Sequence, residues 1–115
     1  MNFETLTDHL KFSTALRYSI YTIKREGLTH KRSYFLLCVY ILKTDKQFRM
    51  YELAQVNKSK PLLFFYVYKF LKFGFLVKDH FTYTLSEKAL RYINDVLQLA
   101  DDLYKKDQYF PTQKS

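Results

Sequence analysis

The chain has 115 residues, enough for one domain with a single core but too few for two. Apolar residues make up 48% of it, which argues against intrinsic disorder, and only two Gly and two Pro argue against a loop-rich or all-β fold. The net charge of +8 favours a polyanionic partner, with a basic protein that lacks such a partner as the alternative.

The N-terminal part of the chain has the periodicity of two helices. Apolar residues recur at steps of four, four and three from Phe12 to Ile23, which predicts a helix over about residues 5–26. Gly27 is placed to end this helix. A second helix is predicted over about residues 30–43, and its wide apolar face indicates burial in the middle of a small domain.

The centre of the chain predicts two helices joined by a tight turn. Residues 51–56 form the first, short helix. Ser59 then stands where an N-cap belongs, and Pro61 is near the first helical position, where its missing N–H costs nothing. The second helix is predicted over residues 60–73, and Gly74 closes it.

The remaining residues predict a hairpin and a long helix. After a β-like link at residues 48–50, the hairpin is a wing over residues 75–85 that turns at Asp79-His80. A helix over residues 87–106 follows, and residues 107–115 are predicted to be a frayed tail. The predicted fold class is mostly α with a small β-hairpin, in one domain over residues 1–106 with long N- and C-terminal helices.

The order of short helix, turn, helix, glycine, hairpin and helix is typical of a winged helix-turn-helix. Over residues 5–106 the chain resembles the MarR family of winged-helix transcription regulators. The pieces that carry the resemblance are Leu28-Thr29, Glu52-Leu53-Ala54, Ser59, Gly74-Phe75-Leu76-Val77 and the segment Tyr83-Thr84-Leu85-Ser86-Glu87-Lys88-Ala89. The resemblance implies a DNA-binding homodimer, in which the helix after the turn enters the major groove and the wing reaches the flanking minor groove.

This chain departs from the family pattern in its wing and in its groove helix. Only Lys78-Asp79-His80 remains of the long basic wing. On the helix 60–73, Leu63, Tyr66, Val67 and Phe70 are expected to face the core, and the outward face is also largely apolar. Base edges are read mainly by Arg, Lys, Asn and Gln, so direct reading of bases is expected to be thin. The residues predicted to contact DNA are Lys31, Arg32, Lys58, Ser59, Lys60, Leu62, Phe65, Tyr68, Lys69, Lys72 and Lys78, with Lys46 and Arg49 as further phosphate contacts.

The last predicted helix carries two adjacent apolar seams. One seam is enough to dock a helix on its own core, so the second predicts a partner subunit. The predicted dimer interface consists of Leu10, Leu16, Leu90, Ile93, Leu97, Ala100 and Tyr104.

Other functions fit the sequence less well. The outward ridge Leu62, Phe65 and Tyr68 suits a protein partner, and this protein-interaction module is the main alternative. Association with a membrane surface through the same helix is a weaker alternative. Tyrosines 18, 21, 34 and 40 line either an effector cleft or the core.

An enzyme is the weakest interpretation. The three His residues are isolated, and no phosphate-binding loop or activated nucleophile is visible, so we expect no catalysis, no metal and no cofactor. The single Cys38 is predicted to be a small core residue, which fits a reducing cytoplasm. The most apolar window, residues 61–77, is short and carries two lysines, so no membrane span and no secretion are expected.

Overall fold

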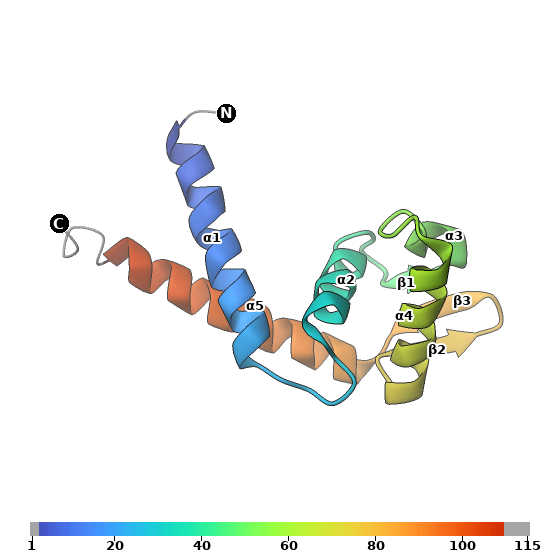
Figure 1. The fold of residues 1–115 in the computed structure, drawn as a ribbon. Coiled ribbons are helices and arrows are strands. Elements are labelled where there is room, and N and C mark those ends of the chain that lie inside the picture. The colour runs from blue at the N-terminus through green and yellow to red at the C-terminus, as the bar shows by residue number, and fades with distance from the viewer. Residues whose placement is uncertain (1–2, 110–115) are drawn as a thin grey trace. The chain divides into compact units, whose positions relative to one another are not determined.

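The structure is a computed structural model that describes residues 3–109, with side chains from 10 to 106. It is mostly helical and contains a small antiparallel sheet of three strands (Figure 1). The elements in chain order are α1 (Phe3–Thr22), α2 (His30–Tyr40), β1 (Gln47–Phe48), α3 (Met50–Leu53), α4 (Lys60–Phe73), β2 (Leu76–Asp79), β3 (Thr82–Leu85) and α5 (Glu87–Tyr109). Of the helices described, none is both long enough and apolar enough to cross a bilayer.

The contacts divide the chain into two compact units. The terminal unit is built from α1 and the part of α5 from Asn94 onward, and the central unit spans Arg25–Ile93. The domain predicted over residues 1–106 therefore runs through both units.

In the terminal unit, α1 crosses the second part of α5 (Figure 1). The Phe12 and Tyr104 rings meet edge to face, with centroids 5.8 Å apart. The buried hydroxyl of Ser19 donates a hydrogen bond of 2.8 Å to the Ala15 carbonyl, which satisfies it within the helix.

The first helix ends four residues earlier than the predicted range of 5–26. Its last backbone bond runs from Ile23 N–H to the Ser19 carbonyl, at 2.9 Å. Gly27 does not cap α1, because it belongs to a separate turn in which Leu28 N–H donates to the Arg25 carbonyl, and its φ is +87°.

The core of the central unit is rich in aromatic rings. The Phe35 ring of α2 lies 5.1 Å from the Tyr66 ring and 5.8 Å from the Phe70 ring of α4, and Phe70 meets Phe75 edge to face. Such pairs stabilise a core beyond the area that they bury. They dock α2 and α4 face to face, so that the opposite side of α4 is left to solvent.

One polar pair is buried among these side chains. The Tyr92 hydroxyl, on the first part of α5, donates a 2.9 Å hydrogen bond to Ser33 Oγ on α2. Both residues are almost fully buried. Burial raises the pKa of Tyr92 above its ordinary value near 10, so the phenol stays neutral and the pair costs no buried charge.

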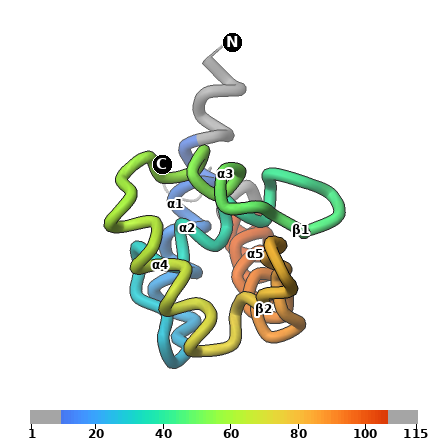
Figure 2. The backbone as a smooth tube through the Cα atoms, turned by 90° about the vertical axis from the view of Figure 1, so that its right-hand side faces the viewer, coloured from blue at the N-terminus to red at the C-terminus, as the bar shows by residue number. Residues whose placement is uncertain are grey.

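The sheet has the strand order β1-β3-β2. The strand β3 pairs antiparallel with both neighbours, from Leu76↔Leu85 to Asp79↔Thr82 on one side and at residues 47–48 on the other. Figure 2 follows the chain from α4 into β2. The predicted turn at Asp79-His80 is wrong by one residue, because Asp79 still pairs in β2 and the two-residue loop is His80-Phe81.

The other predicted boundaries shift for local reasons. α2 ends at Tyr40, three residues early, where the Lys46 ammonium donates to the Tyr40 carbonyl and lies 3.9 Å from the centre of its ring. α3 begins at Met50 and already ends at Leu53. The predicted tail is wrong for residues 107–109, which continue α5, and its residues 110–115 lie outside the described residues.

Candidate nucleic-acid interface

The start of α4 is fixed by a turn rather than by the predicted side-chain cap. Ser59 occupies the N-cap position, but its hydroxyl makes no capping bond. Instead, Asn57 Oδ1 accepts a 2.9 Å hydrogen bond from Ser59 N–H, and Pro61 follows in the first turn of the helix. The Ser59 side chain is therefore exposed at the head of the helix.

The orientation predicted for α4 is confirmed by the burial of its residues. The buried face consists of Leu63, Tyr66, Val67 and Phe70. Leu62, Phe65 and Tyr68 are exposed as expected, and so are Phe64 and Leu71, which the prediction missed. The spacing held a signal for Phe64, since it is four residues from both Lys60 and Tyr68 and shares their face.

Phe65 is surrounded by positive charge. The Arg32 guanidinium lies 5.4 Å from the centre of its ring, and the Lys69 ammonium lies 5.5 Å from it. Arg32 is held in place, because Nη1 donates a 2.7 Å hydrogen bond to the Gly27 carbonyl. The structure thus brings Arg32, Phe65 and Lys69, three residues predicted to contact DNA, into one cluster on α2 and α4.

The end of α4 carries further cations. The Lys72 ammonium lies 5.7 Å from the centre of the Phe73 ring. Lys88, from the first turn of α5, donates a 2.8 Å hydrogen bond to the Phe73 carbonyl. A cation there suits the negative end of the helix dipole, so Lys88 stabilises α4 and is not a free surface charge.

Net charge is confined to the central unit. Arg25–Ile93 holds thirteen Lys and Arg against five Asp and Glu, a balance of +8, whereas the rest of the chain holds six of each. Four of the five acids already face a base: Glu52 and Asp45 pair with Lys43, Glu87 pairs with Arg91, and Asp79 contacts His80. Within the described part of the chain, no carboxylate pairs with Lys31, Lys58, Lys60 or Lys72.

Not every predicted phosphate contact is placed for that role. Lys46 is engaged with the carbonyl and the ring of Tyr40, so its ammonium is not presented to a ligand. Arg49 is exposed at the N-cap of α3, on a different element from the α4 lysines. Lys78, on β2, is exposed, with its ammonium 5.7 Å from the centre of the Tyr83 ring.

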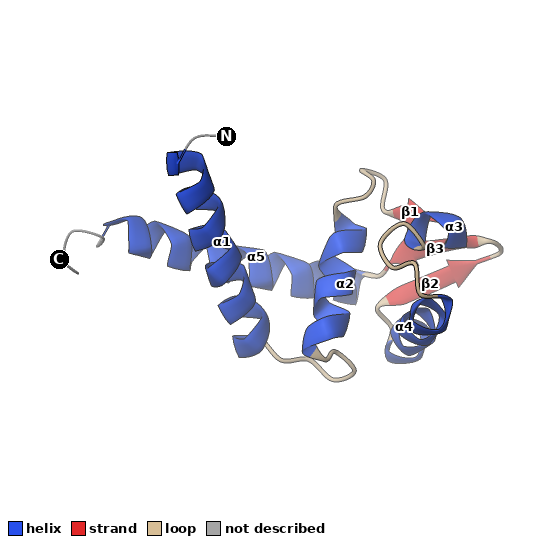
Figure 3. Cartoon of the chain, turned by 45° about the horizontal axis from the view of Figure 1, so that its top comes forward, coloured by secondary structure: helices blue, strands red, loops and turns tan. Residues whose placement is uncertain are grey.

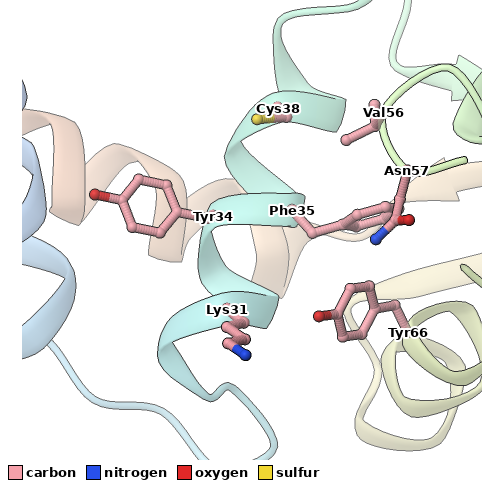
Figure 4. Close-up of a pocket in the computed structure, with 7 residues that line it drawn as sticks. All are labelled: Lys31, Tyr34, Phe35, Cys38, Val56, Asn57 and Tyr66. Carbon is pink, nitrogen blue, oxygen red and sulfur yellow. The ribbon is translucent and has the colours of Figure 1, made fainter. Parts of the chain in front are cut away.

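A shallow pocket lies between α2 and the turn that precedes α4 (Figure 4). Its volume is about 270 Å³, and its lining is mostly apolar. The side chains of Val56, Asn57 and Tyr66 face α2 across it, and Lys31 and Cys38 lie on the α2 side. Of the tyrosines considered for an effector cleft, only Tyr34 lines this pocket, and Cys38 is exposed at its edge rather than buried as predicted.

The predicted dimer residues differ in their exposure. Ile93 and Ala100, which belong to one of the two α5 seams, are fully buried in the single chain and offer no surface to a partner. In the other seam, Ala89, Tyr92 and Val96 are buried as well. Leu10 is exposed, and the half-buried residues are Leu16, Leu90, Leu97 and Tyr104. A dimer interface therefore has to be built from these five.

Comparison with known proteins adds no relative. No protein-family model matches the chain, and searches of the curated proteins and of the solved structures found no match.

Proposed function

We propose that this protein is a DNA-binding transcription regulator that grips duplex DNA with α4 and the lysines around it. The order α2, α3, α4, β2 and β3, with the strand order β1-β3-β2, supports a winged helix-turn-helix in which β2 and β3 are the wing (Figure 3). In this proposal the regulator acts as a homodimer in the cytoplasm, without a cofactor.

The observation that carries the proposal is the gathering, around an exposed helix, of cations that have no carboxylate partner among the described residues. Lys58 and Lys60 lie at the head of α4 beside the Ser59 hydroxyl, Lys69 and Lys72 lie along it, and Lys31 and Arg32 lie on the neighbouring α2. Phosphate contacts of this kind supply affinity and register but little sequence information. They suit a helix whose exposed side chains are mostly apolar.

A salt titration of duplex binding tests the proposal. Affinity should fall by about 10³–10⁵ between 50 and 200 mM salt if about 6–10 phosphates are contacted. Lys60→Ala and Lys72→Ala should each lower the salt slope by about 1, because each removes one phosphate contact. Lys106→Ala, which removes an exposed lysine of the terminal unit, should leave the slope unchanged. Binding that does not respond to salt would contradict the proposal.

A protein partner is the second candidate, and the exposed face of α4 favours it. Five apolar side chains are exposed there, including Phe64 at 54% and Tyr68 at 58%. Exposed apolar patches of this kind often mark protein interfaces. Such a partner would be acidic, to match the lysines between the rings.

Two substitutions at Phe64 separate the candidates. Phe64→Lys should weaken binding of a protein partner but strengthen duplex binding, since it replaces an apolar contact with a cation. Phe64→Glu should weaken both. Fluorescence anisotropy with a labelled duplex measures the change. Stronger duplex binding by Phe64→Lys would support DNA binding through α4. Loss of duplex binding by Phe64→Lys would contradict contact between α4 and DNA.

A further inference from the structure

The tip of the β2–β3 hairpin presents a single large apolar side chain. Phe81 is 79% exposed, more than any other large apolar residue in the described part of the chain. It occupies the second position of the two-residue loop His80-Phe81, where the positive φ is taken by His80 and the backbone at Phe81 accepts any side chain. No core contact explains a phenylalanine there.

The strands below the loop fix the position of its backbone. Asp79 pairs with Thr82 directly below the loop, and β3 is also paired with β1 at residues 47–48. Tyr83 and Leu85 are buried and anchor β3 to the core of the central unit. His80 takes a φ of +55°, which makes the sharp reversal, and its Nδ1 lies 2.8 Å from Asp79 Oδ1. The hairpin projects past α4 in the views of Figures 1 and 3.

We propose that Phe81 is an apolar wedge that inserts between two base pairs of duplex DNA from the minor groove. Apolar side chains used in this way partly unstack one base step and kink the duplex. The favoured target is a flexible pyrimidine–purine step beside the stretch that α4 contacts, because such steps unstack most easily. This inference rests on the proposed function.

The charges beside the tip are consistent with this approach. Lys78 is exposed on β2, three residues from Phe81, and can contact a phosphate at the edge of the groove. Asp79 is the one acid at the tip, and its carboxylate is engaged by His80. Such a wedge would let a chain with few base-reading side chains on α4 distinguish sequences, since the energy of deforming DNA depends on its sequence.

The test uses the full chain and a short duplex with TA steps, in which 2-aminopurine replaces the adenine of each step and the ends carry a fluorescence-transfer pair. Wild-type protein should raise the 2-aminopurine emission and bring the ends closer. Phe81→Ala should lose both signals and bind about tenfold more weakly. Its salt slope should stay unchanged, because no phosphate contact is lost. Phe81→Leu keeps an apolar wedge and should recover most of the bend.

The outcomes separate this inference from the proposed function. If Phe81→Ala bends and unstacks the duplex as the wild type does, the wedge is wrong and DNA binding through α4 still holds. If the wild-type protein does not bind the duplex at low salt, the proposed function fails, and the wedge fails with it. Because Phe81 is exposed, a circular dichroism spectrum should show that both variants fold like the wild type.

Discussion

Two glycines with nearly the same backbone conformation have different surroundings. Gly27 has a φ of +87° and Gly74 a φ of +81°, both in the left-handed region that suits glycine. A Cβ on Gly27 would collide with the Phe73 ring, whereas a Cβ on Gly74 would meet nothing within 4 Å. In the sequence both glycines looked like helix ends, and only Gly74 is one.

Alanine substitutions should therefore differ in cost. Gly74→Ala should lower the free energy of unfolding by about 1–2 kcal/mol, which is the cost of a left-handed alanine. Gly27→Ala should lower it by about 2–4 kcal/mol, because the collision with Phe73 adds an overpacking cost. Urea unfolding followed by circular dichroism measures both. Equal losses for the two variants would show that Phe73 moves aside at no cost.

At the scale of elements, local signals predicted α4 best. Its bounds match the predicted 60–73, because proline at the start, glycine at the end and apolar spacing all act within the helix itself. The ends of α1 and α2 were placed too late, because the contacts that follow each helix were not visible in its apolar spacing: a separate turn from Arg25 to Leu28 follows α1, and Lys46 closes α2. The strand β1 has only two residues and exists through its pairing with β3.

In the candidate site, too, features within one helix were predicted and contacts between elements were not. The buried and exposed faces of α4 follow from helical spacing and were predicted. Arg32 and Lys69 both lie near the Phe65 ring because α2 packs beside α4. The spacing of residues along one helix does not predict how two helices pack. The exposed Phe81 was missed because the predicted turn was one residue off, and a shift of one residue exchanges the positions of strand and loop.

The short helix α3 supplies a prediction about pH. Glu52 Oε1 accepts a 3.0 Å hydrogen bond from Arg49 N–H, and Lys43 pairs with the same carboxylate. The Arg49 N–H first, and Lys43 second, hold the pKa of Glu52 below its ordinary value of 4.5. A lowered pKa means that this carboxylate stabilises the fold above pH 4.5, and that the stabilisation is lost as the pH falls below that value.

Glu52→Gln should therefore be less stable than the wild type at neutral pH, and the difference should shrink in acid. Urea unfolding at pH values above and below 4.5 measures this difference. The control is Glu26→Gln, which changes an exposed carboxylate that lies outside any helix. Its stability should follow that of the wild type at every pH. A Glu52→Gln deficit that stays constant into acid would mean that the carboxylate charge does not hold α3.

At the scale of the whole molecule, net charge is divided unequally between the two units. The central unit carries the whole net charge, and the terminal unit is neutral. This division is consistent with the proposed roles, in which the central unit contacts a polyanion and a second copy associates mainly through Leu10, Leu16, Leu97 and Tyr104 of the terminal unit. Self-repulsion between like-charged units would oppose a dimer formed through the central unit, whereas a neutral surface carries no such penalty.

The proposed homodimer makes the last prediction. The wild-type protein should sediment at about twice the 14.0 kDa of one chain, and Leu10→Glu should shift it to the monomer, because Leu10 is 61% exposed and a buried unpaired carboxylate is costly at an interface. Asn94→Glu adds the same charge at an exposed polar position of α5 and should leave the dimer intact. Ile93→Glu should instead unfold the chain, since Ile93 is fully buried within it. A wild-type protein that sediments as a monomer would limit DNA contact to one α4 helix for each molecule bound.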